Sequence, residues 1–162
     1  GTVAENIARF GEPDPEAVVV AAQRAGADAM IRLLPNGYDT HVGSGGSVLS
    51  AGQRQRVGLA RAIYGLPRLI VLDEPNSNLD DDGERALLDL IAFLRGQGCA
   101  TLLITHKRQV LATVDKLAVI RNGLLALYGP RADVLARLSG QDEGSTNAGA
   151  AAPGARNQPA SA

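Results

Sequence analysis

The stretch Leu69-Ile-Val-Leu-Asp-Glu74 (LIVLDE) decides the fold class. Four consecutive apolar residues followed by two carboxylates predict a strand that is buried on both faces and stops at the acidic pair. A helix capped by Asp80 and running to about Arg95 comes next, and Ala100-Thr-Leu-Leu-Ile-Thr105 predicts a second buried strand. This strand–helix–strand alternation indicates an α/β fold with a mainly parallel sheet.

The segment that precedes this sheet is predicted to be mostly helical. Asp14-Pro15-Glu16 combines an N-cap, a proline in the first turn and an acidic residue, and predicts a helix that extends to about Gly26. A short helix is expected over 27–34. Ser50 and Gln53 form a Ser-x-x-Gln capping box for a further helix that ends near residue 64. We therefore expect a helical subdomain over 1–65.

The rest of the chain is expected to complete the α/β part, over 66–140. A helix is predicted over 107–113, a β-hairpin over 117–128 around the turn Asn122-Gly123, and a last helix over 131–138. Residues 141–162 are mainly Gly, Ala, Ser, Asn and Pro without periodicity, which predicts a disordered tail.

Composition limits the classes of function. The chain has 162 residues, a net charge of −1 and 3% aromatic residues, which argues against a nucleic-acid partner. A single cysteine, Cys99, excludes an internal disulfide and fits a reducing compartment. No apolar run approaches the roughly 20 residues of a membrane span. Because the chain starts at Gly1 without Met, we expect it to be a fragment that lacks its N-terminal part.

The carboxyl ends of the two strands carry candidate catalytic residues, because ligands of open α/β sheets bind there. Asp73 could organise Mg²⁺ on a nucleotide phosphate, and Glu74 could polarise an attacking water as general base. The alternative is that Asp73 caps a turn and Glu74 is merely solvated. His106, at the end of the second strand, could bridge a phosphate and the catalytic carboxylate, although a lone histidine there is more often structural.

The helix after Ser50 has an unusual first turn. Gly52 is a poor choice if stability alone matters, and it suggests that something approaches the backbone closely. The N-terminus of a helix attracts anions through its free N–H groups and its dipole. An anion is therefore expected near Ser50 and Gly52, while the arginines of this helix are expected to serve packing and charge.

Four motifs in a fixed order resemble the C-terminal two-thirds of an ATP-binding cassette (ABC) nucleotide-binding domain, over roughly residues 1–140. They are Leu49-Ser-Ala-Gly-Gln53, Leu69–Glu74, Ser77-Asn-Leu-Asp80 and Thr105-His106, and they look like the signature, the Walker B strand with its catalytic glutamate, the D-loop and the H-loop. The resemblance implies a partial P-loop NTPase fold, with a helical signature subdomain and part of a RecA-like ATPase core.

Three further stretches narrow the resemblance to exporter-type cassettes: Thr2-Val-Ala-Glu-Asn-Ile7, Gly37-Tyr-Asp-Thr-His-Val-Gly43 and Pro75-Asn-Ser-Asn-Leu-Asp80. Asn76 stands where many exporters have Thr, and this form is similar to the permease/ATPases of type I secretion systems.

The resemblance also implies roles, with ATP as the nucleotide and Mg²⁺ as the metal. Glu74 and His106 would be catalytic, and Asp73 would hold Mg²⁺ through water. Two cassettes would close head to tail, so that one signature contacts the γ-phosphate held by the other subunit. The signature residues are Leu49, Ser50, Ala51, Gly52 and Gln53, and the D-loop residues are Ser77, Asn78, Leu79 and Asp80.

The chain departs from the family pattern in two ways. Ala51 replaces the commoner glycine of the signature, for which a mild effect is expected because alanine suits a helix. More importantly, the sequence contains no G-x-x-x-x-G-K-[ST] phosphate loop. The resemblance implies that the intact protein is an ATPase. Because residues 1–162 lack the phosphate loop, we expect them to be inactive by themselves.

The implied partners are a second cassette, most simply a homodimer, and a transmembrane domain that is fused upstream or separate. Membrane-fusion and outer-membrane proteins would join them at the cytoplasmic face of the inner membrane. Three alternatives remain: a drug or lipid exporter, a soluble ABC-type DNA-repair ATPase and a non-catalytic truncated cassette. The short helical lobe argues against the second, and Glu74 with His106 argues against the third.

Overall fold

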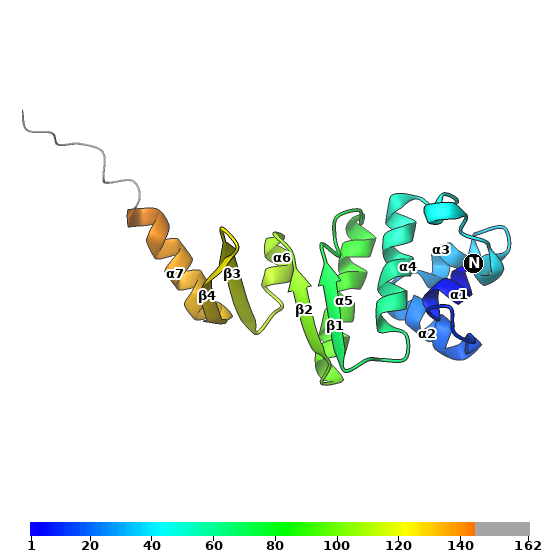
Figure 1. The fold of residues 1–162 in the computed structure, drawn as a ribbon, viewed down its shortest axis with the longest axis horizontal. Coiled ribbons are helices and arrows are strands. Elements are labelled where there is room, and N and C mark those ends of the chain that lie inside the picture. Colours follow the sequence, from blue (N-terminus) through cyan, green and yellow to red (C-terminus); the bar gives the residue numbers. More distant parts are fainter. Residues whose placement is uncertain (145–162) are drawn as a thin grey trace, which may run out of the picture. The chain divides into compact units, whose positions relative to one another are not determined.

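The computed structural model describes residues 1–144, with side chains through residue 139. The chain divides into two compact units, one covering Gly1–Thr113 and the other beginning at Val114 (Figure 1). The elements of the first unit are α1 (Val3–Ile7), α2 (Pro15–Arg24), α3 (Asp28–Arg32), the 3-10 turns η1 (Gly37–Asp39) and η2 (Ser44–Gly46), α4 (Ala51–Ile63), β1 (Leu69–Asp73), α5 (Asp81–Gly96), β2 (Ala100–Ile104) and α6 (Arg108–Leu111).

The longer helices start at the predicted caps. The Asp14 carboxylate accepts from the N–H of Glu16 at 3.0 Å, and Pro15 is the first residue of α2. Asp80 caps α5 by accepting from the N–H of Gly83 at 2.9 Å. Each cap satisfies a backbone donor that the helix leaves free, for a gain of roughly 1 kcal/mol.

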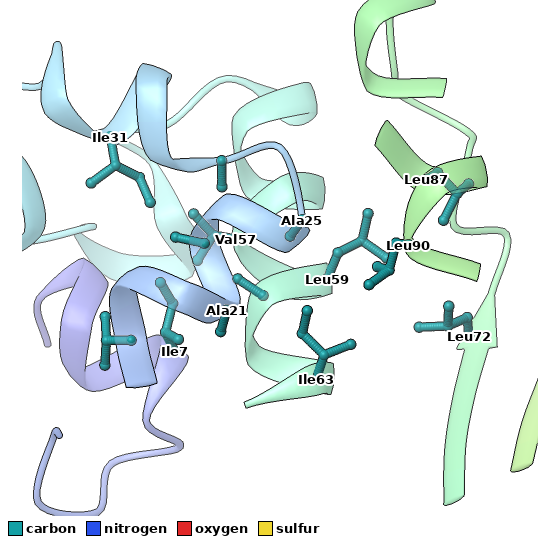
Figure 2. Close-up of a cluster of buried hydrophobic side chains, with 14 of the residues drawn as sticks. Ile7, Ala21, Ala25, Ile31, Val57, Leu59, Ile63, Leu72, Leu87 and Leu90 are labelled. Atoms are coloured by element: carbon teal, nitrogen blue, oxygen red, sulfur yellow. The ribbon is translucent and has the colours of Figure 1, made fainter. Parts of the chain in front are cut away.

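The first unit has one continuous core. Buried side chains extend from the helices α1–α4 to β1 and α5 (Figure 2). Ile7, Ile31 and Leu90 are at most 1% exposed, and each contributes about 1.5–3 kcal/mol on burial. The core therefore fixes α4 against β1, which is the geometry that the site depends on.

The strands β1 and β2 pair in parallel, with Leu69 opposite Ala100 and Asp73 opposite Ile104. The expected parallel pairing is confirmed, but the expectation that both faces are buried is wrong for the described chain. In β1 only alternate residues are buried, and Val71 on the other face is 55% exposed. The same exposed class includes Leu69, Leu102 and Ile104. The apolar run supplies two buryable faces, but the described residues cover only one.

The second unit is a hairpin followed by a helix: β3 (Lys116–Arg121) pairs antiparallel with β4 (Leu124–Pro130), and α7 (Arg131–Gly144) follows. Asn122 and Gly123 both have positive φ, 52° and 77°, as a two-residue type I′ turn requires. The last helix is longer than expected, because it ends at Gly144 instead of residue 138. Apart from residues 141–144, the predicted disordered tail lies outside the described residues.

Candidate functional site

The register of the parallel pair brings two loops together at the carboxyl ends of β1 and β2. Because Asp73 lies opposite Ile104, the next residues of both strands leave the sheet at the same edge. The N–H of Glu74 donates to the carbonyl of Ile104 at 2.8 Å and continues the ladder by one bond. Glu74 has a φ of 45°, in a region that glutamate rarely adopts. The backbone that orients its side chain is therefore strained.

Glu74 and His106 form the predicted pair. The Oε1 atom of Glu74 lies 3.0 Å from Nδ1 of His106. The other oxygen, Oε2, is buried and has no hydrogen-bond partner among the described residues. The Glu74 side chain as a whole is 39% exposed, so a carboxylate that an imidazole holds at the edge of the sheet remains open to solvent, as a general base must be.

Asp73 is exposed at the end of β1, and its carboxylate makes no hydrogen bond or ion pair with the described part of the chain. Among the described residues, no three metal-ligating side chains gather to form a metal cage. A carboxylate without a protein partner is available to a cation such as Mg²⁺, which is usually held by one or two carboxylates together with waters and nucleotide phosphates.

The start of α4 is a complete capping box, as predicted. The N–H of Gln53 donates to Oγ of Ser50 at 3.2 Å, and the N–H of Ser50 donates to Oε1 of Gln53 at 2.8 Å. Leu49 is 4% exposed and anchors this turn in the core, whereas Ala51 is exposed. The box fixes the position of the signature, and the Ser50 hydroxyl still has its proton to donate to a ligand.

Gly52 lies against the backbone of the same chain. A Cβ atom at this position would be 2.8 Å from the carbonyl oxygen of Asn78 in the D-loop. Sequence reasoning attributed this glycine to the approach of a ligand. The structure adds a second reason, since the first turn of α4 and the D-loop pack too closely for a side chain.

Asp80 links the D-loop to α4. Its carboxylate accepts from the Gly83 N–H and forms an ion pair with Arg56. The Gly83 hydrogen bond, with a further contribution from Arg56, outweighs desolvation and holds the pKa of Asp80 below its usual value. Nearby, Nδ2 of Asn78 donates to Oγ of Ser77 at 3.1 Å, and Leu79 is half-buried.

Sequence reasoning missed the position of Arg56, whose side chain is only 19% exposed and also donates to the carbonyl of Gly26 at 3.4 Å. The other arginines of α4 act as expected. Arg54 donates to the carbonyls of Gly46 and Leu49, and Arg61 lies over the ring of Phe10. No local pattern distinguishes Arg56 from them.

A second missed contact joins Asn76 and Thr105. Oγ1 of Thr105 donates to Oδ1 of Asn76 at 2.9 Å, and Asn76 is 3% exposed. Asn76 lies in the predicted stretch Pro75–Asp80 and Thr105 in the predicted Thr105-His106 motif, but only the strand register shows that they meet.

None of the helices in the described range 1–144 is long and apolar enough to cross a bilayer.

The chain is similar to known proteins both in sequence and in fold. Residues 1–77 match the family model described as ABC transporter. The chain is 50% identical over 139 residues to the Type I secretion system ATP-binding protein PrsD of Rhizobium meliloti, covering 85% of this chain and 24% of that protein. It is 41% identical over 138 residues to the ATP-dependent lipid A-core flippase of Chromohalobacter salexigens, covering 84% of this chain and 24% of that protein.

A solved structure, that of a bacterial Atm1-family ABC exporter with ATP bound, has a similar fold. It superposes with a TM-score of 0.75 at 32% identity, and the match covers 93% of this chain and 27% of that one. The chain thus spans about a quarter of the length of these relatives.

Proposed function

This chain belongs to the ABC transporter family, and we propose that the whole protein hydrolyses ATP to drive export across the inner membrane, with a type I secretion substrate as its cargo. The observation that carries the catalytic part is the contact of Glu74, whose side chain is 39% exposed, with His106 at the carboxyl ends of the paired strands. The similarity to PrsD supports the type of cargo.

Each residue at the strand ends has a proposed role. Glu74 accepts the proton of the attacking water, and His106 holds the Glu74 carboxylate and contacts the γ-phosphate. Asp73 would hold Mg²⁺ through water, and the bound metal would neutralise charge on the phosphates. The chain's own contribution is therefore to orient the carboxylate and to receive the proton.

The signature and the D-loop are proposed to act across a dimer. Two cassettes close head to tail, and Ser50 donates to the γ-phosphate held by the partner subunit, with Gly52 allowing close backbone approach. The other signature residues hold this turn: Leu49, Ala51 and Gln53. The D-loop connects the turn to the catalytic carboxylate through Ser77, Asn78, Leu79 and Asp80. The capping box and the packing of Gly52 on Asn78 support a rigid unit of this kind.

The proposed assembly comprises a second copy of the cassette, a transmembrane domain, and membrane-fusion and outer-membrane proteins, with the cassette at the cytoplasmic face. No nucleic acid takes part. Within the cassette we propose a helical signature subdomain over 1–65 and part of a RecA-like ATPase core over 66–140.

Because the sequence has no phosphate loop, we propose that residues 1–162 alone neither hydrolyse ATP nor bind it at millimolar concentration, which isothermal calorimetry would test.

A second candidate cargo is a lipid or drug, since a lipid A-core flippase and a multidrug efflux protein are also similar to this chain. Stimulation of the ATPase by an unfolded secretion substrate, with none by lipid A or by hydrophobic drugs, would favour protein secretion.

The test of the catalytic proposal uses the whole protein. Glu74→Gln should lower the rate of MgATP hydrolysis by about 10²–10⁴-fold, the usual contribution of a general base, while ATP binding is retained. Glu16→Gln, an exposed glutamate in α2, is the matched control and should hydrolyse ATP at the normal rate. Normal turnover of Glu74→Gln would overturn the proposed function.

A further inference from the structure

Two side-chain contacts join the loops that leave β1 and β2. One is the Glu74–His106 contact at 3.0 Å, and the other is the Asn76–Thr105 hydrogen bond at 2.9 Å. The first is solvated, since the His106 side chain is 78% exposed, whereas Asn76 is 3% exposed.

We propose that Asn76 and Thr105 are positioning residues, which hold the loop carrying His106 so that Nδ1 meets the Glu74 carboxylate. This inference rests on the proposed function, because it assigns a purpose to the orientation of the catalytic pair.

The exposed pair needs such support. A solvent-exposed contact between charged or polar side chains contributes only about 0–1 kcal/mol, too little to order two loops by itself. Thr105 directly precedes His106, so a hydrogen bond that fixes Thr105 also fixes the backbone from which the imidazole projects. Asn76 is buried and Thr105 is half-buried, so their hydrogen bond is better shielded from water than the Glu74–His106 contact and is the stronger restraint of the two.

In the segment between β2 and α6, Nζ of Lys107 forms an ion pair with Oε1 of Glu84 at 2.9 Å, which holds the end of that side chain but not the backbone beside His106. Lys107 is the N-cap of α6, but its side chain makes no cap hydrogen bond. Instead the N–H of Lys107 donates to Oγ1 of Thr105 at 3.1 Å. The Thr105 hydroxyl thus accepts from Lys107 and donates to Asn76, and one side chain fixes both flanks of His106.

Asn76 is also unfavourable for the stability of the fold. Its Nδ2 atom is buried and has no hydrogen-bond partner within the described residues. An unpaired buried donor costs about 1–3 kcal/mol, which an apolar residue of similar size would avoid. A role in orienting the catalytic loop accounts for a polar side chain here.

The test is made in the whole protein with Thr105→Val, which removes the hydroxyl and keeps the shape, and with Thr105→Ser, which keeps the hydroxyl. We expect Thr105→Val to lower kcat for ATP about tenfold while KM changes less than about twofold, because misplacement of a catalytic group affects the chemical step more than binding. Thr105→Ser should restore most of the rate. Thr113→Val, which removes a hydroxyl bonded to the Val110 carbonyl, is the matched control and should leave kcat unchanged.

The decisive readout is coupling to His106. If Thr105 acts through the imidazole, Thr105→Val should have no further effect on the residual rate of a His106→Ala protein. The same tenfold loss in both backgrounds, or no loss in either, would overturn the inference. Glu74→Gln is measured alongside: a rate loss in that variant, with a normal Thr105→Val, would refute the positioning role and leave the proposed function intact.

Discussion

Ser50 is the N-cap of α4 and the second residue of the predicted signature, and its hydroxyl already accepts the Gln53 N–H of the capping box. Any test of its role toward a phosphate must therefore keep the cap. Asn and Asp cap helices about equally well and have nearly the same shape, so they separate the effect of charge from the effect of capping.

We predict that Ser50→Asp lowers the ATPase rate of the whole protein about tenfold or more relative to Ser50→Asn. The Asp carboxylate would face the γ-phosphate of the partner subunit's nucleotide, and like charges at close range repel. The two variants should unfold at the same urea concentration. Equal ATPase rates for the pair would contradict the proposed contact across the dimer.

At the residue scale, Asp80 makes a pH-dependent contribution to the stability of the folded protein. Its pKa is lowered in the folded protein by the Gly83 N–H and by Arg56. A carboxyl whose folded pKa lies below its unfolded value, about 3.9, stabilises the protein above that pH. The contribution is lost as the pH falls through the folded pKa.

The corresponding prediction concerns Asp80→Asn, which keeps a capping side chain and removes the charge. At pH 7 the complete ATPase domain carrying this change should unfold at a lower urea concentration than the parent. The gap should narrow as the pH falls below the unfolded value and the parent carboxyl becomes protonated as well. A gap of constant size between pH 7 and pH 2 would mean that the carboxylate charge is not the source of stability.

At the scale of elements, the packing of α4 on the D-loop depends on Gly52. A Cβ atom there would meet the Asn78 carbonyl at 2.8 Å, whereas one on Gly58 of the same helix would meet nothing within 4 Å. Gly58 therefore serves as the comparison for Gly52, because an alanine at position 58 brings the gain in helix propensity without a clash with the backbone.

Gly52→Ala is predicted to destabilise the ATPase domain by about 1–3 kcal/mol, the usual cost of overpacking, because the D-loop backbone must move. Gly58→Ala should instead stabilise it by about 0.5–1 kcal/mol. Urea denaturation of both variants at pH 7 checks the difference. A stabilising Gly52→Ala would show that the D-loop moves aside without cost.

The elements that could be predicted from sequence are those with local chemical signals. Asp14 with Pro15, Ser50 with Gln53, and Asn122-Gly123 each mark a cap or a turn within four residues, and each lies where it was expected. The parallel pairing of β1 and β2 followed from their alternation with a helix.

Contacts between distant segments could not be predicted in the same way. The Arg56–Asp80 pair and the Asn76–Thr105 bond join residues 24 and 29 positions apart, and nothing local to either partner identifies the other. The length of the last helix was also misjudged, because the composition of its end is typical of a loop.

At the scale of the whole molecule, one apolar face of the β1–β2 pair is exposed to solvent, and this exposure needs an explanation. Val71 and Leu102 are 55% and 53% exposed, yet the continuous apolar runs of both strands are typical of burial on two sides. Since the relatives that match this chain are about three and a half times as long, we expect other parts of the whole protein to cover this face.

Cysteine labelling tests that expectation. In a Cys99→Ser background, Val71→Cys should react with a maleimide rapidly in residues 1–162 alone and about tenfold or more slowly in the whole protein, because a covered side chain reacts only when the structure opens locally. Ala92→Cys, on the exposed side of α5, is the control for reagent access and should react at similar rates in both. If Val71→Cys reacted equally fast in both proteins, the apolar face would be open in the whole protein. The double burial that its sequence indicates would then need another explanation.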